Sequence, residues 1–505
     1  MKKLNKKQRV RNIAPRNMLE MEAEKEDTTE TPKINYLKVI IDNTLRMLMG
    51  VRNVSASYSE SNGTLLPGFM LSPVALGMDW NSMAPGMDFV FGSQRDIRDD
   101  AAKNDWLTKD PVFNSAYMTK YTQNLSLRST IEPITDFRIE LTGNRNFSEN
   151  HQEYFRVNEN EEWESFSPME TGSFSISYLT ISTAFIKNEK DHSNKIFENF
   201  KEYRLTIAMR LANNNYKNWK HTFMLDSVSG INYPSGYGPA SQDVLIPAFL
   251  AAYSGQNPDN IGLSPFPKIP KPNWRITYNG LSKIKFLKKY FKSVNLGHAY
   301  RSSYNVGSYT TNVLYKEDQD GFQKIRNELG ERNFIPKREI NQISITEQFS
   351  PLININMTWN NSILTKFEIK RTRNLSMSFA NNQLTEVSSK EIIVGFGYRI
   401  KNVVLYVKSI GGGGRKKRLE SDINIKADVS VRNNKTVLRK LIENTDQISS
   451  GQQVISINTS ADYMISEQFT VRAFFDKIIN NPFVSSQYKN SNTNAGISIR
   501  FTLAQ

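Results

Sequence analysis

The residues that could carry catalysis are few and scattered. The chain has 505 residues and no cysteine, which excludes disulfides, thiol nucleophiles and thiolate metal sites. A histidine site would need a second ligand or a base at a suitable spacing, and none accompanies the four histidines, which are His151, His192, His221 and His298. We therefore predict no catalytic residue, no cofactor site and no metal site. The histidines are interpreted as polar residues of loops or of a lumen.

Two further motifs have an ordinary explanation. Gly411 to Gly414 precede Arg415 and Lys416, which could indicate a phosphate-binding loop, but no Lys-Ser or Lys-Thr pair opens a helix behind them. A hairpin loop with solvated charge fits better. The acidic pairs Asp99-Asp100 and Glu161-Glu162 lie in charged stretches, so we interpret them as surface residues and not as a pair of catalytic carboxylates.

A basic and aromatic segment at 281–292 has several interpretations. It carries five lysines among aromatic residues and predicts an amphipathic helix. We favour a helix packed across one end of a sheet with its lysines in water. Lipid headgroups are the second interpretation, and nucleic acid binding is a third.

The elements that would position these residues are strands. Between Ile423 and Arg432 apolar and polar residues alternate with a period of two, which is typical of a β-strand. The pattern returns at 455–465, at 469–475 and at 495–503, and each run is close to the roughly 9–11 residues that cross a bilayer at a tilt. Residues typical of turns separate the runs, among them Asn433-Asn434 and Ser449 to Gly451.

The polar face of these strands decides between two environments. A soluble sandwich buries its apolar face, whereas a membrane barrel turns that face to lipid. We predict that the polar face lines an aqueous lumen, and its charged candidates are Lys426, Asp428, Arg432, Asp462, Arg472 and Arg500. We predict that the last strand directs barrel assembly through Ile497, Ile499, Phe501 and Leu503. A second layer of the same chain over Ile457, Val471 and Ile499 would exclude this arrangement.

Composition agrees with a barrel. Hydrophobic residues make up 38% of the chain and the mean hydropathy is -0.51, as expected if only alternate strand residues are apolar. The most apolar stretch, at 244–253, is too short to span a bilayer as a helix and contains Pro247. The net charge of +15 permits binding to anionic partners, but aromatic residues spread through the strands argue against a nucleic acid partner.

The expected organisation is a polar segment at 1–35 followed by a transmembrane β-barrel portion at 36–505. Long inserted loops are predicted at about 62–122 and 230–272, with Asn62-Gly63 as a hairpin turn. A further strand is predicted at 203–211, where Tyr203, Leu205 and Ile207 alternate with polar residues. The basic start of the chain lacks the apolar core of a signal peptide, so we expect this sequence to be the last part of a longer exported protein.

Several long strings resemble the C-terminal region of the SprA/Sov family, the outer-membrane translocon of the type IX secretion system in Bacteroidetes. They are NGTLLPGF (62–69), FVFGSQRDI (89–97), EPITDFRIELTGNRN (132–146), GYGPASQDVLIPAFLAAYSG (236–255), FPKIPKPNWRITYNGL (266–281), HAYRSSYNVGSY (298–309) and the terminal ISIRFTLAQ. The resemblance covers the chain from about Val51 onward.

The resemblance implies an all-β chain that is part of a very large antiparallel outer-membrane β-barrel with long loops and a few short helices. It implies export of folded proteins that carry C-terminal sorting signals, and support of gliding motility. The implied partners are the N-terminal remainder of the translocon, a PorV-like shuttle barrel, a periplasmic plug protein, secreted cargo and outer-membrane lipid. The alternatives are a soluble β-rich surface module that binds glycan or protein, and another outer-membrane transport barrel.

Overall fold

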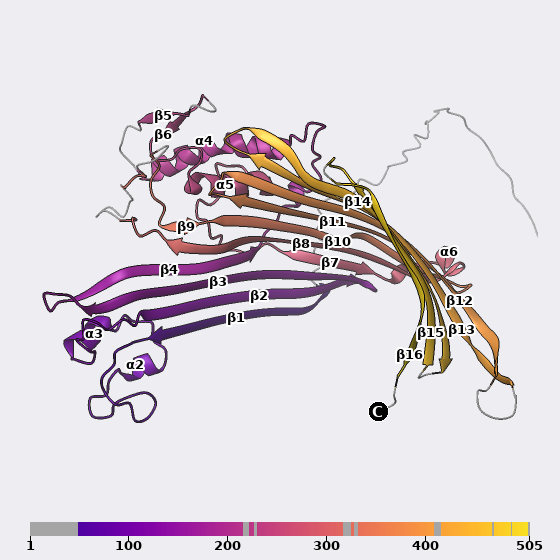
Figure 1. Ribbon diagram of the computed structural model, residues 1–505, viewed down its shortest axis with the longest axis horizontal. Coiled ribbons are helices and arrows are strands. Elements are labelled where there is room, and N and C mark those ends of the chain that lie inside the picture. The colour runs from indigo at the N-terminus through magenta and orange to yellow at the C-terminus, as the bar shows by residue number, and fades with distance from the viewer. Residues whose placement is uncertain are drawn as a thin grey trace, which may run out of the picture. The chain divides into compact units, whose positions relative to one another are not determined.

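The computed structural model describes residues 49–215, 222–226, 230–316, 325–327, 332–408, 416–466, 469–485 and 487–502. Long antiparallel strands dominate this part of the chain (Figure 1). Fourteen of them form one sheet, whose main path runs β1-β2-β3-β4-β8-β10-β11-β12-β13-β14-β15-β16, and β5 and β6 form a separate hairpin. None of the helices in these residues has the length and apolar character needed to cross a membrane.

The strands of the main path are mostly long. Their bounds are Val51–Leu65 (β1), Tyr117–Ile134 (β2), Phe137–Val157 (β3), Trp163–Ser177 (β4), Phe291–Thr311 (β8), Gln342–Trp359 (β10), Ile363–Ser378 (β11), Gln383–Lys408 (β12), Lys416–Lys440 (β13), Thr445–Ser466 (β14), Phe469–Pro482 (β15) and Asn490–Phe501 (β16). Tight turns between them contain residues with positive φ, a conformation that Asp and Asn adopt more readily than most other residues. Examples are Asp136, Asn382 and Asn444.

The shorter elements lie between these strands. The short strands are Phe223–Leu225 (β5), Asn232–Pro234 (β6), Asn273–Tyr278 (β7) and Arg338–Ile340 (β9). The helices are Met87–Val90 (α2), Arg98–Lys103 (α3), Ile181–Thr183 (η1), Lys195–Asn215 (α4), Gln242–Ser254 (α5), Gly280–Lys283 (η2) and Lys285–Lys288 (α6).

The strands β4 and β7 together occupy one position in the sheet, between β3 and β8. The first half of β3 pairs with β7 and its second half with β4, and β8 is divided between the same two strands. The chain leaves the sheet after β4, forms η1, α4 and α5, and returns as β7. The side chains of Ser177 and Asn273 are hydrogen bonded at 3.2 Å where the two strands meet. This excursion therefore places helices beside the sheet without opening its hydrogen-bonded ladder.

The main hydrophobic core lies between the excursion and one face of the sheet. The helix α5 is buried from Val244 to Ser254, and the α4 residues Phe200, Ile207 and Ala208 are fully buried. They pack with buried apolar residues of five neighbouring strands, including Ile176, Tyr304, Ile343, Ile345, Leu375, Met377 and Leu384. Figure 1 shows α4 and α5 beside these strands. Burial of this many apolar side chains is the main stabilising contribution to the excursion.

Several sequence-based element assignments are wrong. The residues predicted as a strand at 203–211 lie in α4, because the segment is rich in helix-forming Leu, Ala, Met and Arg and packs through Phe200, Arg204, Ile207 and Ala208, a helical spacing. The region 230–272 is not simply a loop, because its apolar stretch forms α5 with Pro247 inside the helix. Pro247 is the sixth residue of α5, so the helix lacks the backbone hydrogen bond that an N–H at this position would donate to Asp243, and burial of the helix in the core offsets this loss.

Most strands are longer than predicted. Asn62-Gly63 lies within β1, Asn433-Asn434 within β13 and Ser449 to Gly451 within β14, so none of them is a turn. Cross-strand pairing with long neighbours overrides their turn preference. The first long connection accordingly runs from 66 to 116, and the predicted basic helix at 281–292 is reduced to η2 and the four-residue α6. The predicted segment 1–35 lies outside the described residues.

Candidate functional site: the two faces of one sheet

The register carries two chemically different faces across the sheet. Residues directly opposite one another on neighbouring strands share a face. Val429 pairs with Ile457 and Val471 pairs with Ile499, whereas Asp428, on the other face, pairs with Asn458. We call the first the apolar face and the second the polar face. The same two faces continue from β10 to β16. At most positions along these strands an apolar residue pairs with an apolar residue, and a polar residue with a polar one.

One end of the apolar face is covered by the chain itself. Ile345 of β10, Leu375 of β11 and Leu384 of β12 are fully buried beneath α4 and α5. We call the residues of the apolar face that the excursion buries the covered zone. The rest of the face we call the uncovered zone.

The uncovered zone continues the same strands, and no layer of the described residues lies over it. Leu384 and Phe396 lie on the same face of β12, and no register shift separates them, yet Leu384 is 0% and Phe396 48% exposed. Other exposed apolar residues of this zone are Ile353, Val394, Ile425, Val429, Phe475, Ile497, Ile499 and Phe501. In water such a surface would be unfavourable, since an exposed apolar patch of this extent marks an interaction site.

No second layer formed by the described part of the chain seals the residues predicted to meet lipid. Ile499 is 65% exposed, while Ile457 and Val471 are half-buried and belong to neither cluster of buried apolar residues. The predicted assembly residues Ile497, Ile499 and Phe501 all lie on this face of β16. Leu503 lies outside the described residues.

All six predicted lumen residues lie on the polar face. Lys426, Asp428 and Arg432 alternate along β13, and Asp462, Arg472 and Arg500 lie on β14, β15 and β16. Asp462 and Arg472 are opposite one another, and their side chains form an ion pair at 3.5 Å. That the polar face borders an aqueous lumen stays a prediction.

A row of buried charges forms the edge of the covered zone. Arg373 forms an ion pair with Glu347 at 3.0 Å, and Arg439 forms ion pairs with Glu386 at 2.8 Å and with Asp446 at 3.0 Å. The arginines are 4% and 0% exposed at their side chains. Sequence periodicity did not indicate this row, because a charge on an apolar face breaks the alternation by which strands are recognised.

The charged row holds the start of the excursion. Arg373 donates hydrogen bonds to the backbone oxygen and to the hydroxyl of Thr183, and Arg439 donates to the backbone oxygen of His192 at 2.7 Å. The Thr180 hydroxyl donates to Glu347 at 2.6 Å. We call residues 178–194 the strap. Buried charges are tolerated here because each is paired and hydrogen bonded.

The histidines and acidic pairs do not come together. His298 is hydrogen bonded to the backbone oxygen of Leu352, His192 contacts Lys435, and His151 lies beside Glu153. His221 and the Gly411 to Arg415 segment lie outside the described residues. In the part of the chain that is described, no three His, Asp or Glu side chains are grouped as metal ligands would be.

Asp243 is a titratable group of the excursion whose pKa is raised. Burial at the first turn of α5 raises the pKa of the Asp243 carboxyl to about 6. The cause is loss of hydration, which disfavours the charged form. Between about pH 4 and 6, Asp243 is therefore mostly protonated in the folded chain and mostly ionised in the unfolded chain.

Comparison with known proteins does not assign the chain to a family. No family model matches the sequence, and no curated protein matches it. Among solved structures, an anion-selective porin from Comamonas acidovorans is similar at 10% sequence identity over 76% of this chain and 95% of that chain, with a TM-score of 0.12. Such a low TM-score does not establish a shared arrangement of strands.

Proposed function

We propose that this chain forms part of the wall of an outer-membrane β-barrel, with the uncovered zone in lipid and the polar face against water. The observation that supports it is the change along β12, where one face is buried by helices at Leu384 and bare and apolar at Phe396. Strands of 12–26 residues are long enough to cross the hydrocarbon layer at a tilt. A soluble protein would leave this surface wet.

Aromatic and basic residues bound the uncovered zone. Phe291 and Trp359 lie together at one end of it, with ring centroids 4.3 Å apart. Phe286, 70% exposed, and Tyr290 lie on the adjacent 279–290 connection among exposed lysines. Aromatic rings and lysines of this kind suit the headgroup layer, with rings at the apolar boundary and ammonium groups among phosphates. This favours the lipid interpretation of the basic segment.

The connections suggest an orientation. The turns at this end include 135–136 and 360–362, whereas the connections at 66–116 and 312–341 leave from the opposite end. Outer-membrane barrels have short periplasmic turns and longer extracellular loops. We therefore assign the end with Trp359 to the periplasmic side.

The finer proposal is a protein-conducting barrel of the type IX secretion system. It rests on the SprA/Sov resemblance and on the continuous polar face, which suits passage of folded proteins. In this proposal the cargo moves past the polar face, a PorV-like barrel collects it, and a plug protein closes the periplasmic side. Within the described residues, β1 and β16 each have one neighbouring strand, and an unpaired edge in lipid is unfavourable. Further translocon strands would pair with these edges.

Membrane extraction tests the first proposal. The chain is expected to stay in the membrane pellet after carbonate treatment and to migrate faster in unheated than in heated gel samples. Release into the soluble fraction as a monomer would instead support the soluble surface module.

Site-specific photo-crosslinking tests the finer proposal. A crosslinker at Ser430, on the polar face, is expected to capture secreted proteins that carry a sorting signal. The same crosslinker at the neighbouring Val429, on the apolar face, should capture none. Equal capture of cargo from both positions, or from neither, would contradict a conducting polar face.

A further inference from the structure

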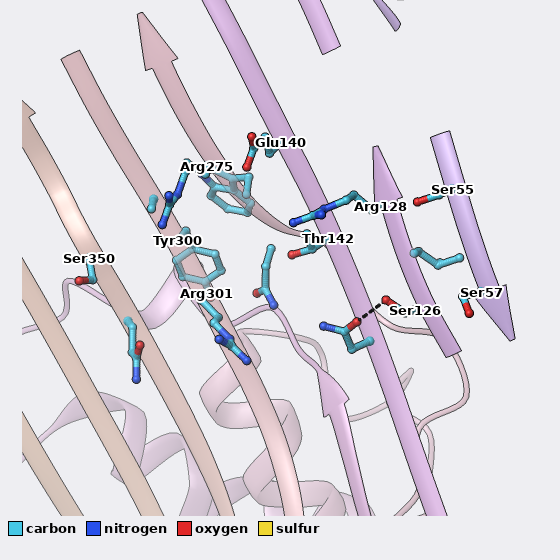
Figure 2. A pocket seen from close by; sticks show the side chains of 16 residues that line it. Ser55, Ser57, Ser126, Arg128, Glu140, Thr142, Arg275, Tyr300, Arg301 and Ser350 are labelled. Carbon is cyan, nitrogen blue, oxygen red and sulfur yellow. Dashed lines mark hydrogen bonds between the residues drawn. The ribbon is translucent and has the colours of Figure 1, made fainter. Parts of the chain in front are cut away.

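The polar face contains a hollow over the first strands of the sheet. It has a volume of about 750 Å³ and is lined by residues of β1, β2, β3, β7, β8 and β10. Most of its polar lining consists of hydroxyl and amide side chains, including Ser55, Ser57, Ser126, Thr142 and Asn144. The Ser126 hydroxyl donates a hydrogen bond to Asn144 at 3.0 Å (Figure 2). The hollow therefore offers both donors and acceptors.

The charges of the hollow are strongly unequal. Arg128, Arg275 and Arg301 line it, against one carboxylate, Glu140. Figure 2 shows these three arginine side chains around the hollow, from β2, β7 and β8. Glu140 already forms an ion pair at 2.8 Å with Arg138, which is not part of the lining. None of the three lining arginines forms an ion pair with another residue of the described chain.

The position in the sheet that β4 and β7 share brings these arginines together. Asn273, buried at the start of β7, donates to Ser177 and accepts from the backbone N–H of Ser302 at 2.7 Å. Two residues further along β7, Arg275 pairs with Glu140 of β3. Arg301 follows directly after Ala299 and Tyr300, which pair with β7. The guanidinium groups are thus carried by rigid strands and not by loops.

We propose that this hollow binds acidic peptide segments of the proteins that pass the polar face. The proposal rests on the proposed function and deepens it. A guanidinium group matches a carboxylate with two parallel hydrogen bonds, and the hydroxyl and amide side chains can bond the peptide backbone between acidic side chains. Elsewhere on the polar face the cations Lys366 and Arg472 are already paired with carboxylates. The hollow is distinguished by three arginines that line one place and form no ion pair within the described residues.

Peptide binding to the full chain in detergent micelles tests the site. The probes are fluorescein-labelled hexaglutamate and hexaglutamine, followed by fluorescence anisotropy. Hexaglutamate is expected to bind more tightly than hexaglutamine and to weaken with added salt. The combined change Arg128→Gln, Arg275→Gln and Arg301→Gln should weaken hexaglutamate binding at least tenfold.

A matched variant separates this site from general charge attraction. Lys426→Gln, Arg432→Gln and Arg500→Gln remove the same charge from exposed positions of the polar face outside the hollow, and should weaken binding less than twofold. Equal weakening by the two triple variants would overturn the proposal. The labelled hexaglutamate can also be displaced with unlabelled hexaglutamate or with tripolyphosphate. If tripolyphosphate displaced it at the lower concentration, the proposal would be overturned in favour of a phosphate polymer as the ligand.

Folding and membrane insertion are monitored separately. Far-UV circular dichroism should be the same for both triple variants, and the single change Arg301→Gln should still weaken binding a few fold if the triple variant misfolds. A chain that binds hexaglutamate through these arginines yet is released by carbonate would contradict the membrane proposal and not the site. A chain that stays in the membrane but binds both peptides equally would contradict the site alone.

Discussion

The covered and uncovered zones of the apolar face have the same sequence pattern and different surroundings. Along β10, Ile345 is 0% exposed and Ile353 44% exposed, although both lie on the apolar face. The first meets helices of the same chain, and nothing in the described residues covers the second. The alternation in the sequence therefore indicates that a face is apolar. Which part of that face the protein itself buries is known only from the position of α4 and α5.

The charged row also separates the two zones. Paired charges are found beneath the strap, where the chain holds them with hydrogen bonds, and the exposed apolar residues of the uncovered zone lie beyond them. A charge on the apolar face is tolerated where protein groups pair with it or form hydrogen bonds to it. The same charge is unfavourable where it faces lipid, which offers neither. The following predictions use this difference.

The largest effect is expected in the covered zone. Arg373→Met leaves the Glu347 carboxylate buried without its partner, which should cost about 3–5 kcal/mol in the free energy of unfolding measured in urea. Restoring neutrality with Glu347→Gln in the same chain should recover most of that loss. Lys370→Met, which removes a half-buried lysine 3.6 Å from Glu368 on the polar face but leaves Glu368 paired with Lys366 at 2.9 Å, should cost about 0–1 kcal/mol. Equal costs for the two single changes would contradict the role of the row.

The second effect belongs to the uncovered zone. Val394→Arg places a charge on the bare apolar surface and should cost about 2–4 kcal/mol when the chain is folded into lipid vesicles. Ser430→Arg, one residue from the cross-strand partner of Val394 and on the polar face, should stay within about 0.5 kcal/mol. If both changes were neutral, the uncovered zone would be in water and the comparison of the zones would fail.

The third effect concerns assembly. Phe501→Asp adds a charge to the apolar face of β16 and is expected to lower the amount of protein in the outer membrane several-fold, as measured by immunoblotting of membrane fractions. Ser498→Asp, on the polar face of the same strand, is the control and should leave that amount unchanged. Normal membrane levels of the Phe501 variant would show that β16 does not direct assembly through this residue.

The smallest effect is a pH dependence of the excursion. Because the pKa of Asp243 is raised to about 6, its contribution favours folding at low pH and is lost as the pH rises from about 4 through 6. Asp243→Asn should therefore increase the free energy of unfolding by about 1–2 kcal/mol at pH 8 and leave it nearly unchanged at pH 4. Thermal melting of the helical signal at both pH values measures this. A gain at pH 4 equal to that at pH 8 would contradict a titrating Asp243.

Local pattern was a reliable guide in the last strands and a poor one in the excursion. The alternation around Val429, Val471 and Ile499 assigned each residue to the face on which the register places it. At 203–211 the same period of two appeared within a helix, since nine residues with mixed polarity fit both periods. Asn433-Asn434 resembled a turn because turn preference is local, whereas strand length depends on the neighbours that are available for pairing.

The sequence by itself determined the two faces of the last strands, because side chains alternate across a strand whatever the strand packs against. Tertiary structure alone decided which apolar residues the chain covers, how Arg373 and Arg439 find their carboxylates, and that Arg128, Arg275 and Arg301 line one hollow. These groupings join residues that are far apart in the sequence. They depend on strand order and register, which a periodic pattern does not specify.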